Sequence, residues 1–90
     1  MNMLDDTEIG YLYFSFEDYL FIQKHFPKLY KLFEKYVDDR SEKIRLAVTD
    51  KSCDDLDNKV LITIGASAAY TVDGEPTEQA VKLEEIWDRA

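Results

Sequence analysis

Two side chains in this sequence could do covalent chemistry, a single histidine, His25, and a single cysteine, Cys53. A histidine beside a cysteine can take the thiol proton and turn the sulfur into a nucleophile. Cys53, however, lies in an aspartate-rich segment, residues 50–57, and neighbouring carboxylates raise the pKa of a thiol and suppress the thiolate. The sequence also contains no nucleophile elbow, phosphate-binding glycine loop or zinc-protease motif. We therefore predict a protein that is not an enzyme and that needs no cofactor.

The segment DKSCDDLDN, residues 50–58, supplies four carboxylates, and oxygen ligands of this kind suit calcium. An EF-hand loop needs a glycine at its sixth position and an acid at its twelfth. Counted from Asp50, these positions are Asp55 and Leu61, and the frame that begins at Asp55 fails as well. We predict no metal site and interpret the segment as a solvated loop between two strands.

Charged residues are unevenly distributed along the chain, which has 19 acidic and 11 basic residues and a net charge of -8. Both ends are acidic, while residues 24–45 are net basic. Direct binding of nucleic acid requires a positive footprint, so this balance disfavours it and favours attraction to a basic protein partner. Four lysines in the basic segment share one helix face, which we interpret as a solvated surface, with a phosphate contact as the alternative: Lys24, Lys28, Lys31 and Lys35.

Carboxylates in two regions are the candidates for contact with a basic partner. They are Asp50, Asp54, Asp55, Asp57, Asp73, Glu75, Glu84 and Glu85. Rows of carboxylates can imitate the spaced phosphates of a nucleic acid and occupy the basic groove of a nuclease. The alternative is that these acids only keep the domain soluble.

Aromatic residues are concentrated early in the chain, where residues 11–30 hold eight of the twelve. Most of these rings have a place on the inward face of a predicted element, but Tyr11, Tyr13 and Phe21 do not. Aromatic side chains are enriched at the cores of protein interfaces. We therefore expect these three rings to contact a partner or a second copy of the chain. The alternative is that a small domain wraps its one core with large residues.

The apolar pattern predicts an α+β fold in a single domain, residues 1–90. Apolar residues at three–four spacing predict a helix over about 16–38, capped by Ser15 and either kinked or divided at Pro27. A second helix is expected over about 76–89, with Pro76 at its first position. The helices should cover one face of an antiparallel sheet of three or four strands, at about 11–15, 43–50, 59–65 and 68–72. A helix over the whole of residues 7–38 is the main alternative for the first third.

The single cysteine excludes an internal disulfide and fits a reducing compartment. The sequence contains neither a signal peptide nor an apolar run long enough to span a membrane. We therefore expect a cytoplasmic protein without membrane contacts.

In its small size, acidity and surplus tyrosine, the chain resembles small inhibitor proteins. Examples are immunity proteins that neutralise a nuclease toxin and phage inhibitors that mimic nucleic acid. The resemblance is one of composition and covers no aligned stretch. It implies a non-enzymatic inhibitor that engages a basic, nucleic-acid-handling protein. The alternative is a structural or assembly protein that forms a homodimer through its aromatic N-terminal third.

Overall fold

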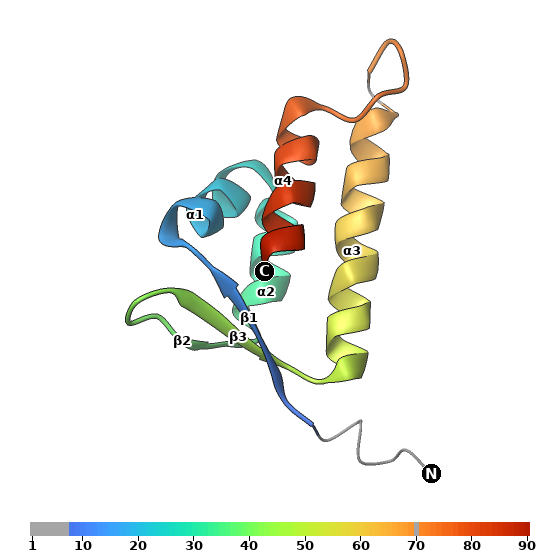
Figure 1. The fold of residues 1–90 in the computed structure, drawn as a ribbon. Helices are drawn as coiled ribbons and strands as arrows, with labels where there is room; N and C mark the ends of the chain where they lie inside the picture. The colour runs from blue at the N-terminus through green and yellow to red at the C-terminus, as the bar shows by residue number, and fades with distance from the viewer. Residues whose placement is uncertain (1–7, 70) are drawn as a thin grey trace.

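A computed structural model describes residues 8–69 and 71–90 of the protein (Figure 1). Within these residues, three strands form an antiparallel sheet in the order β1-β3-β2, and the helices lie on one side of it. This arrangement confirms the predicted α+β class. The elements are β1 (Gly10–Phe14), α1 (Phe16–His25), α2 (Pro27–Glu34), β2 (Val37–Asp39), β3 (Ile44–Val48), α3 (Asp50–Ala68) and α4 (Glu78–Arg89).

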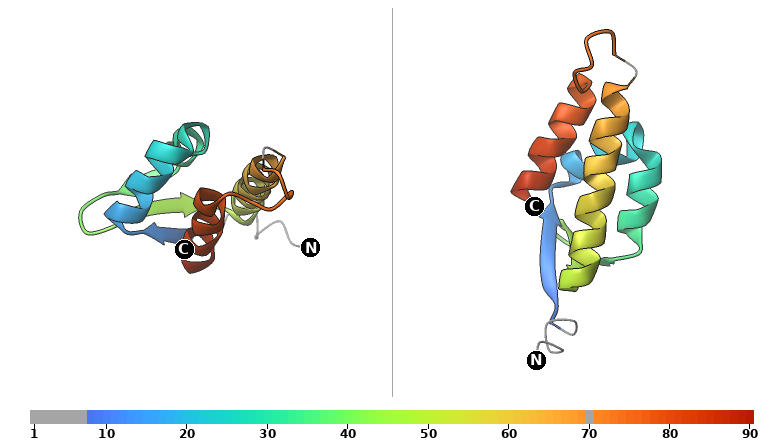
Figure 2. Two further views of the ribbon diagram at one scale, coloured as in Figure 1. Left: turned by 90° about the horizontal axis from the view of Figure 1, so that it is seen from above. Right: turned by 90° about the vertical axis from the view of Figure 1, so that its right-hand side faces the viewer.

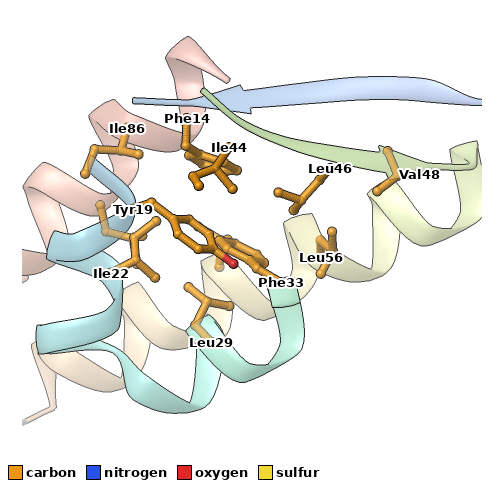
Figure 3. Close-up of a cluster of buried hydrophobic side chains, with 12 residues drawn as sticks. Phe14, Tyr19, Ile22, Leu29, Phe33, Ile44, Leu46, Val48, Leu56 and Ile86 are labelled. Atoms are coloured by element: carbon orange, nitrogen blue, oxygen red, sulfur yellow. The ribbon is translucent and has the colours of Figure 1, made fainter. Parts of the chain in front are cut away.

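The hydrophobic core lies between the inner face of the sheet and the helices. Alternate residues of β1 and β3 point into it, and Figure 3 shows Phe14, Ile44 and Leu46 directed toward Phe33 of α2 and Leu56 of α3. The right-hand view of Figure 2 shows α3 flanked by α4 on one side and by α2 on the other. No helix in the described part of the chain is long and apolar enough to cross a membrane.

The first third begins with a strand, so the all-helical alternative for this region is wrong. Ser15 then caps α1 as predicted, because its side chain accepts a hydrogen bond of 3.1 Å from the backbone N–H of Asp18. Pro27 divides the predicted long helix into two, since it begins α2 after Phe26 leaves the helical conformation. The proline ring has no N–H to donate and its fixed φ suits the first turn of a helix.

The predicted helix over 16–38 also extends too far, because α2 ends at Glu34 and Val37–Asp39 form β2. Residues at the end of a marginal helix can exchange helical hydrogen bonds for sheet hydrogen bonds when a strand lies beside them. Here β3 provides that strand, and the Ala47 N–H donates to the carbonyl of Tyr36 at 2.9 Å. The strand predicted over 43–50 is confirmed as β3, with slightly shorter bounds.

The strands predicted over 59–65 and 68–72 are wrong, and so is the loop predicted over 50–58. These residues form α3, which begins after Thr49, and residues 69, 71 and 72 lie in the connection to α4. Tyr70, which falls in the second predicted strand, lies outside the described residues. Cys53, Leu56, Val60 and Ile64 have helical spacing and face the core, whereas the alternating run 60–64 alone also fits a strand.

The C-terminal helix is confirmed, but it starts two residues later than predicted. Thr77 caps α4 by accepting a hydrogen bond of 3.2 Å from the backbone N–H of Ala80. Pro76 therefore precedes the cap and does not occupy the first helical position. α4 buries Ala80, Leu83 and Ile86, while Val81 is exposed.

Candidate functional site

The aspartates expected in a loop instead lie on the first half of α3. All are exposed. Asp50, Asp54 and Asp57 follow one another at helical spacings of four and three, so they share the side of α3 nearest α4. Asp55 lies on the opposite side, where it lines a hollow between α2 and α3. Because this segment is a helix and not the predicted loop, three of the four aspartates point in a common direction and the fourth points away from them.

A hydrogen bond between α3 and α4 connects these aspartates to the acids of the C-terminal helix. The indole N–H of Trp87 donates to Asp57 Oδ1 at 2.7 Å, and the two helices run side by side in Figures 1 and 2. Three exposed acids of α4, Glu84, Glu85 and Asp88, lie within three residues of Trp87 and extend this acidic surface onto α4. We call this surface the acidic face and define it as Asp50, Asp54, Asp57, Glu84, Glu85 and Asp88.

Two of the predicted acids do not belong to the acidic face. Asp73 and Glu75 lie in the connection between α3 and α4. Figure 1 shows this connection at the opposite end of α3 from the aspartates. The structure therefore brings together Asp50, Asp54, Asp57, Glu84 and Glu85 from the predicted set, and leaves out Asp55, Asp73 and Glu75.

The arginines are paired with acids that do not belong to the acidic face. Arg40 pairs with Glu34 at 2.6 Å, Arg45 with Asp38 at 2.8 Å, and Arg89 with Asp18 at 3.1 Å. Among the residues that the structure describes, no member of the acidic face takes part in an ion pair. Within the described residues, the negative charge of this face is therefore not neutralised by ion pairs.

Cys53 lies in the first turns of α3 and packs against the hydrophobic core. Burial raises the pKa of its thiol, and the nearby carboxylates of Asp54, Asp57 and Asp50 raise it further. His25 is at the end of α1, where its ring contacts that of Phe21 with 4.5 Å between centroids. In the described part of the chain, no group of three His, Cys, Asp or Glu side chains could hold a metal ion.

The three aromatic candidates divide between two surfaces. Tyr11 and Tyr13 are 45% and 47% exposed, and they alternate along β1 with the buried Phe14, so they lie on the outer face of the sheet. There the Arg45 guanidinium lies 4.6 Å from the centroid of the Tyr11 ring. Phe21 is half-buried on α1, and the Lys82 ammonium of α4 lies 4.6 Å from its centroid. Phe21 thus has a structural role in joining α1 to α4.

The predicted lysine stripe is interrupted where Pro27 divides the helix. Lys24 belongs to α1, while Lys28 and Lys31 belong to α2 and Lys35 follows its last residue. All four are exposed. Only the last three can share one face, because the chain leaves the helical conformation between Lys24 and Lys28.

Two exposed apolar residues on α3 were missed because this region was predicted as a strand. In a strand, Ile62 would share one face with Val60 and Ile64, but in the helix it is 63% exposed. Leu61 is 55% exposed and follows Asp57 by one turn on the side near α4. A helical interpretation of residues 53–64 would have found both, since both lie off the stripe formed by the buried residues.

The comparisons with known proteins gave no match: no protein-family model, curated protein or solved structure matches this chain.

Proposed function

We propose that this chain is a small, non-enzymatic inhibitor that binds a basic, nucleic-acid-handling protein through its acidic face. The observation that carries the proposal is the placement of six exposed carboxylates on two adjoining helices, none of them in an ion pair among the described residues. A helix holds successive carboxylates in fixed positions, about 6 Å and 4.5 Å apart along the axis for Asp50, Asp54 and Asp57. Such a row can occupy a groove that otherwise binds phosphates.

Exposed apolar residues next to these carboxylates would supply the contacts that slow dissociation, which charge alone does not provide. Charge accelerates the encounter, whereas desolvated apolar contacts govern the dissociation rate. Leu61 lies one turn beyond Asp57, and Val81 lies one turn before Glu84 and Glu85; both are exposed. The proposal therefore uses Leu61 and Val81 as anchors at the acidic face, in place of Tyr11, Tyr13 and Phe21.

A binding panel tests this function. The protein would be titrated by biolayer interferometry against immobilised basic nucleases and CRISPR-type effectors, with a basic protein that does not act on nucleic acid as control. We expect selective binding to a panel member, with an association rate that falls about tenfold between about 50 mM and 500 mM salt. Undetectable binding to every panel member at low salt would contradict the proposal.

The open outer face of the sheet favours a second candidate, a homodimer. Tyr11 and Tyr13 are exposed there at alternate positions of β1, and they pair with Ala47 and Arg45 of β3. Packing of two such faces would bury four tyrosine rings. Sedimentation at micromolar concentration should then show a dimer that the double variant Tyr11→Ser, Tyr13→Ser converts to a monomer, and a strictly monomeric wild type would exclude it.

A further inference from the structure

A groove lies between α2 and α3. In the right-hand view of Figure 2, α2 lies on the side of α3 opposite α4. Two hollows of about 510 and 500 Å³ adjoin along it, and Ile62 lines both. On α3 the groove extends from Asp55 to Ala66, which at 1.5 Å per residue corresponds to about 16 Å, or three helical turns.

Both helices contribute apolar residues to the groove. Leu29 of α2 and Leu56 of α3 are buried core residues that form part of the lining. Ile62 projects beside them with most of its side chain exposed. Farther along α3 the lining residues are Thr63 and Ala66, and the small side chain of Ala66 lets another backbone approach closely. The shape and lining match a surface that accepts the apolar stripe of another helix.

Basic side chains flank this apolar surface. Lys28 and Lys59 line the groove, and Lys31 and Lys35 continue from Lys28 along the exposed side of α2. None of these lysines is in an ion pair among the residues that the structure describes. Asp55 is the single acidic side chain that lines the two hollows. The groove is therefore locally positive, although the chain as a whole has a net charge of -8.

We propose that the groove binds an acidic amphipathic helix of a partner protein, about three turns long. Its apolar residues at positions i, i+3 or i+4, and i+7 would fill the two hollows around Ile62. Its acidic residues on either flank would face the lysines. Charge complementarity selects this occupant, because a basic helix would be repelled by the same side chains. A nucleic-acid backbone is disfavoured, since it would place phosphates against the leucine and isoleucine of the groove.

Two synthetic peptides, each about three helical turns long, test the proposal. The acidic peptide has leucine at every third or fourth position and glutamate between, and in the basic peptide lysine replaces each glutamate. In fluorescence anisotropy at about 50 mM salt, the acidic peptide should bind at least about tenfold more tightly than the basic one. Its binding should shift amide resonances of α2 and α3 in NMR spectra. Equal affinity for both peptides, or resonance shifts confined to other elements, would overturn the proposal.

Two matched variants test whether the acidic peptide binds in the groove. Ile62→Asp should weaken binding of the acidic peptide at least about tenfold, because it puts a charge at the centre of the apolar surface. Leu61→Asp makes the same change at the neighbouring exposed residue, which lines neither hollow, and should leave the affinity within about twofold. Both sites are exposed, so thermal melts should be similar for the two variants. If the two variants bind alike, the groove is not the site.

Two further results would assign the groove to a different occupant and overturn the proposal. One is a duplex oligonucleotide that displaces the peptide and binds more tightly than it. The other is a concentration-dependent dimer of the wild type that Ile62→Asp dissociates in sedimentation experiments.

Discussion

Tyr19, Glu34 and Arg40 form a hydrogen-bonded chain that joins α1, the end of α2 and the turn between β2 and β3. The Tyr19 hydroxyl donates to Glu34 Oε2 at 2.5 Å, and Arg40 Nη2 donates to Glu34 Oε1 at 2.6 Å. Tyr19 is only 4% exposed. Burial raises the pKa of Tyr19, and the Glu34 carboxylate raises it further. The hydrogen bond from Arg40 lowers the pKa of Glu34, with a further contribution from Tyr19.

The structure predicts different losses of stability for substitutions of Tyr19 and of Glu34 in this hydrogen-bonded network. Tyr19→Phe keeps the ring and leaves Glu34 paired with Arg40, so it removes one hydrogen bond to a charged group. Such bonds contribute about 1.5–3 kcal/mol, and we expect the lower value because the carboxylate is partly solvated. Glu34→Ala leaves the buried hydroxyl without its partner, which costs about 1–3 kcal/mol, and also removes a surface ion pair of about 0.2–1 kcal/mol. Glu34→Ala should therefore be the more destabilising change.

Urea unfolding monitored by the fluorescence of Trp87 measures both losses. The Trp87 ring stacks on Phe33 in the core with 5.7 Å between centroids, so its emission should report global unfolding. Tyr30→Phe is the matched control, because Tyr30 packs 5.3 Å from the Tyr19 ring and no hydrogen bond of its hydroxyl is found in the described structure. The control should change stability by less than about 0.5 kcal/mol. If Tyr19→Phe changes it no more than the control, or if its effect adds to that of Glu34→Ala without coupling, the reasoning is refuted.

The pH dependence follows from the direction of each pKa shift. The folded-state pKa of Glu34 is lowered, so its contribution is complete above the unfolded pKa and is lost as the pH falls through the folded value. The folded-state pKa of Tyr19 is raised, so its contribution is complete below the ordinary value of 10.0 and is lost as the pH rises beyond it. Unfolding at alkaline pH should show a smaller stability difference between wild type and Tyr19→Phe than at neutral pH. A constant difference would contradict this assignment.

Further predictions concern the caps and the thiol. Thr49→Ala removes the side chain that accepts a 3.1 Å bond from the Ser52 N–H at the start of α3 and should cost about 1 kcal/mol in urea unfolding; an unchanged midpoint would show that the cap contributes nothing. Thr77→Ala should have a similar effect through α4. Cys53 should react slowly with iodoacetamide at neutral pH, since burial and the neighbouring aspartates raise its pKa, and faster in urea; rapid labelling of the folded protein would contradict its placement.

The sequence was informative where local signals and tertiary contacts agree. Ser15 and Pro27 fix the start of α1 and the break before α2 through chemistry that acts within one turn. The alternation of Ile44, Leu46 and Val48 fits only a half-buried strand. Residues 60–64 carry an alternating apolar pattern that both a strand and a helix can satisfy, and β-branched residues favoured the strand. The helix forms because Thr49 caps it and Cys53 and Leu56 extend its buried stripe toward the N-terminus.

Prediction of the candidate site from the sequence was limited by the same ambiguity between strand and helix. The types of the acidic residues could be taken from the sequence, but their common face could not, because it requires α3 to be a helix and α4 to lie beside it. The bond between Trp87 and Asp57 joins residues thirty positions apart and has no local signal. The exposure of Ile62 and Leu61 likewise follows only from the helix. The outward position of Tyr11 and Tyr13, by contrast, was predictable from strand alternation alone.

The most direct test of the acidic face as a binding site compares two variants with equal net charge. Their binding kinetics are measured with the basic partner identified in the panel. Asp54→Asn with Glu84→Gln neutralises two positions on the acidic face, whereas Glu8→Gln with Glu42→Gln neutralises two exposed acids elsewhere. We predict that the first variant lowers the association rate at low salt by at least about threefold and that the second leaves it nearly unchanged. Equal losses in both variants would show that only net charge matters, which would contradict a binding site on the acidic face.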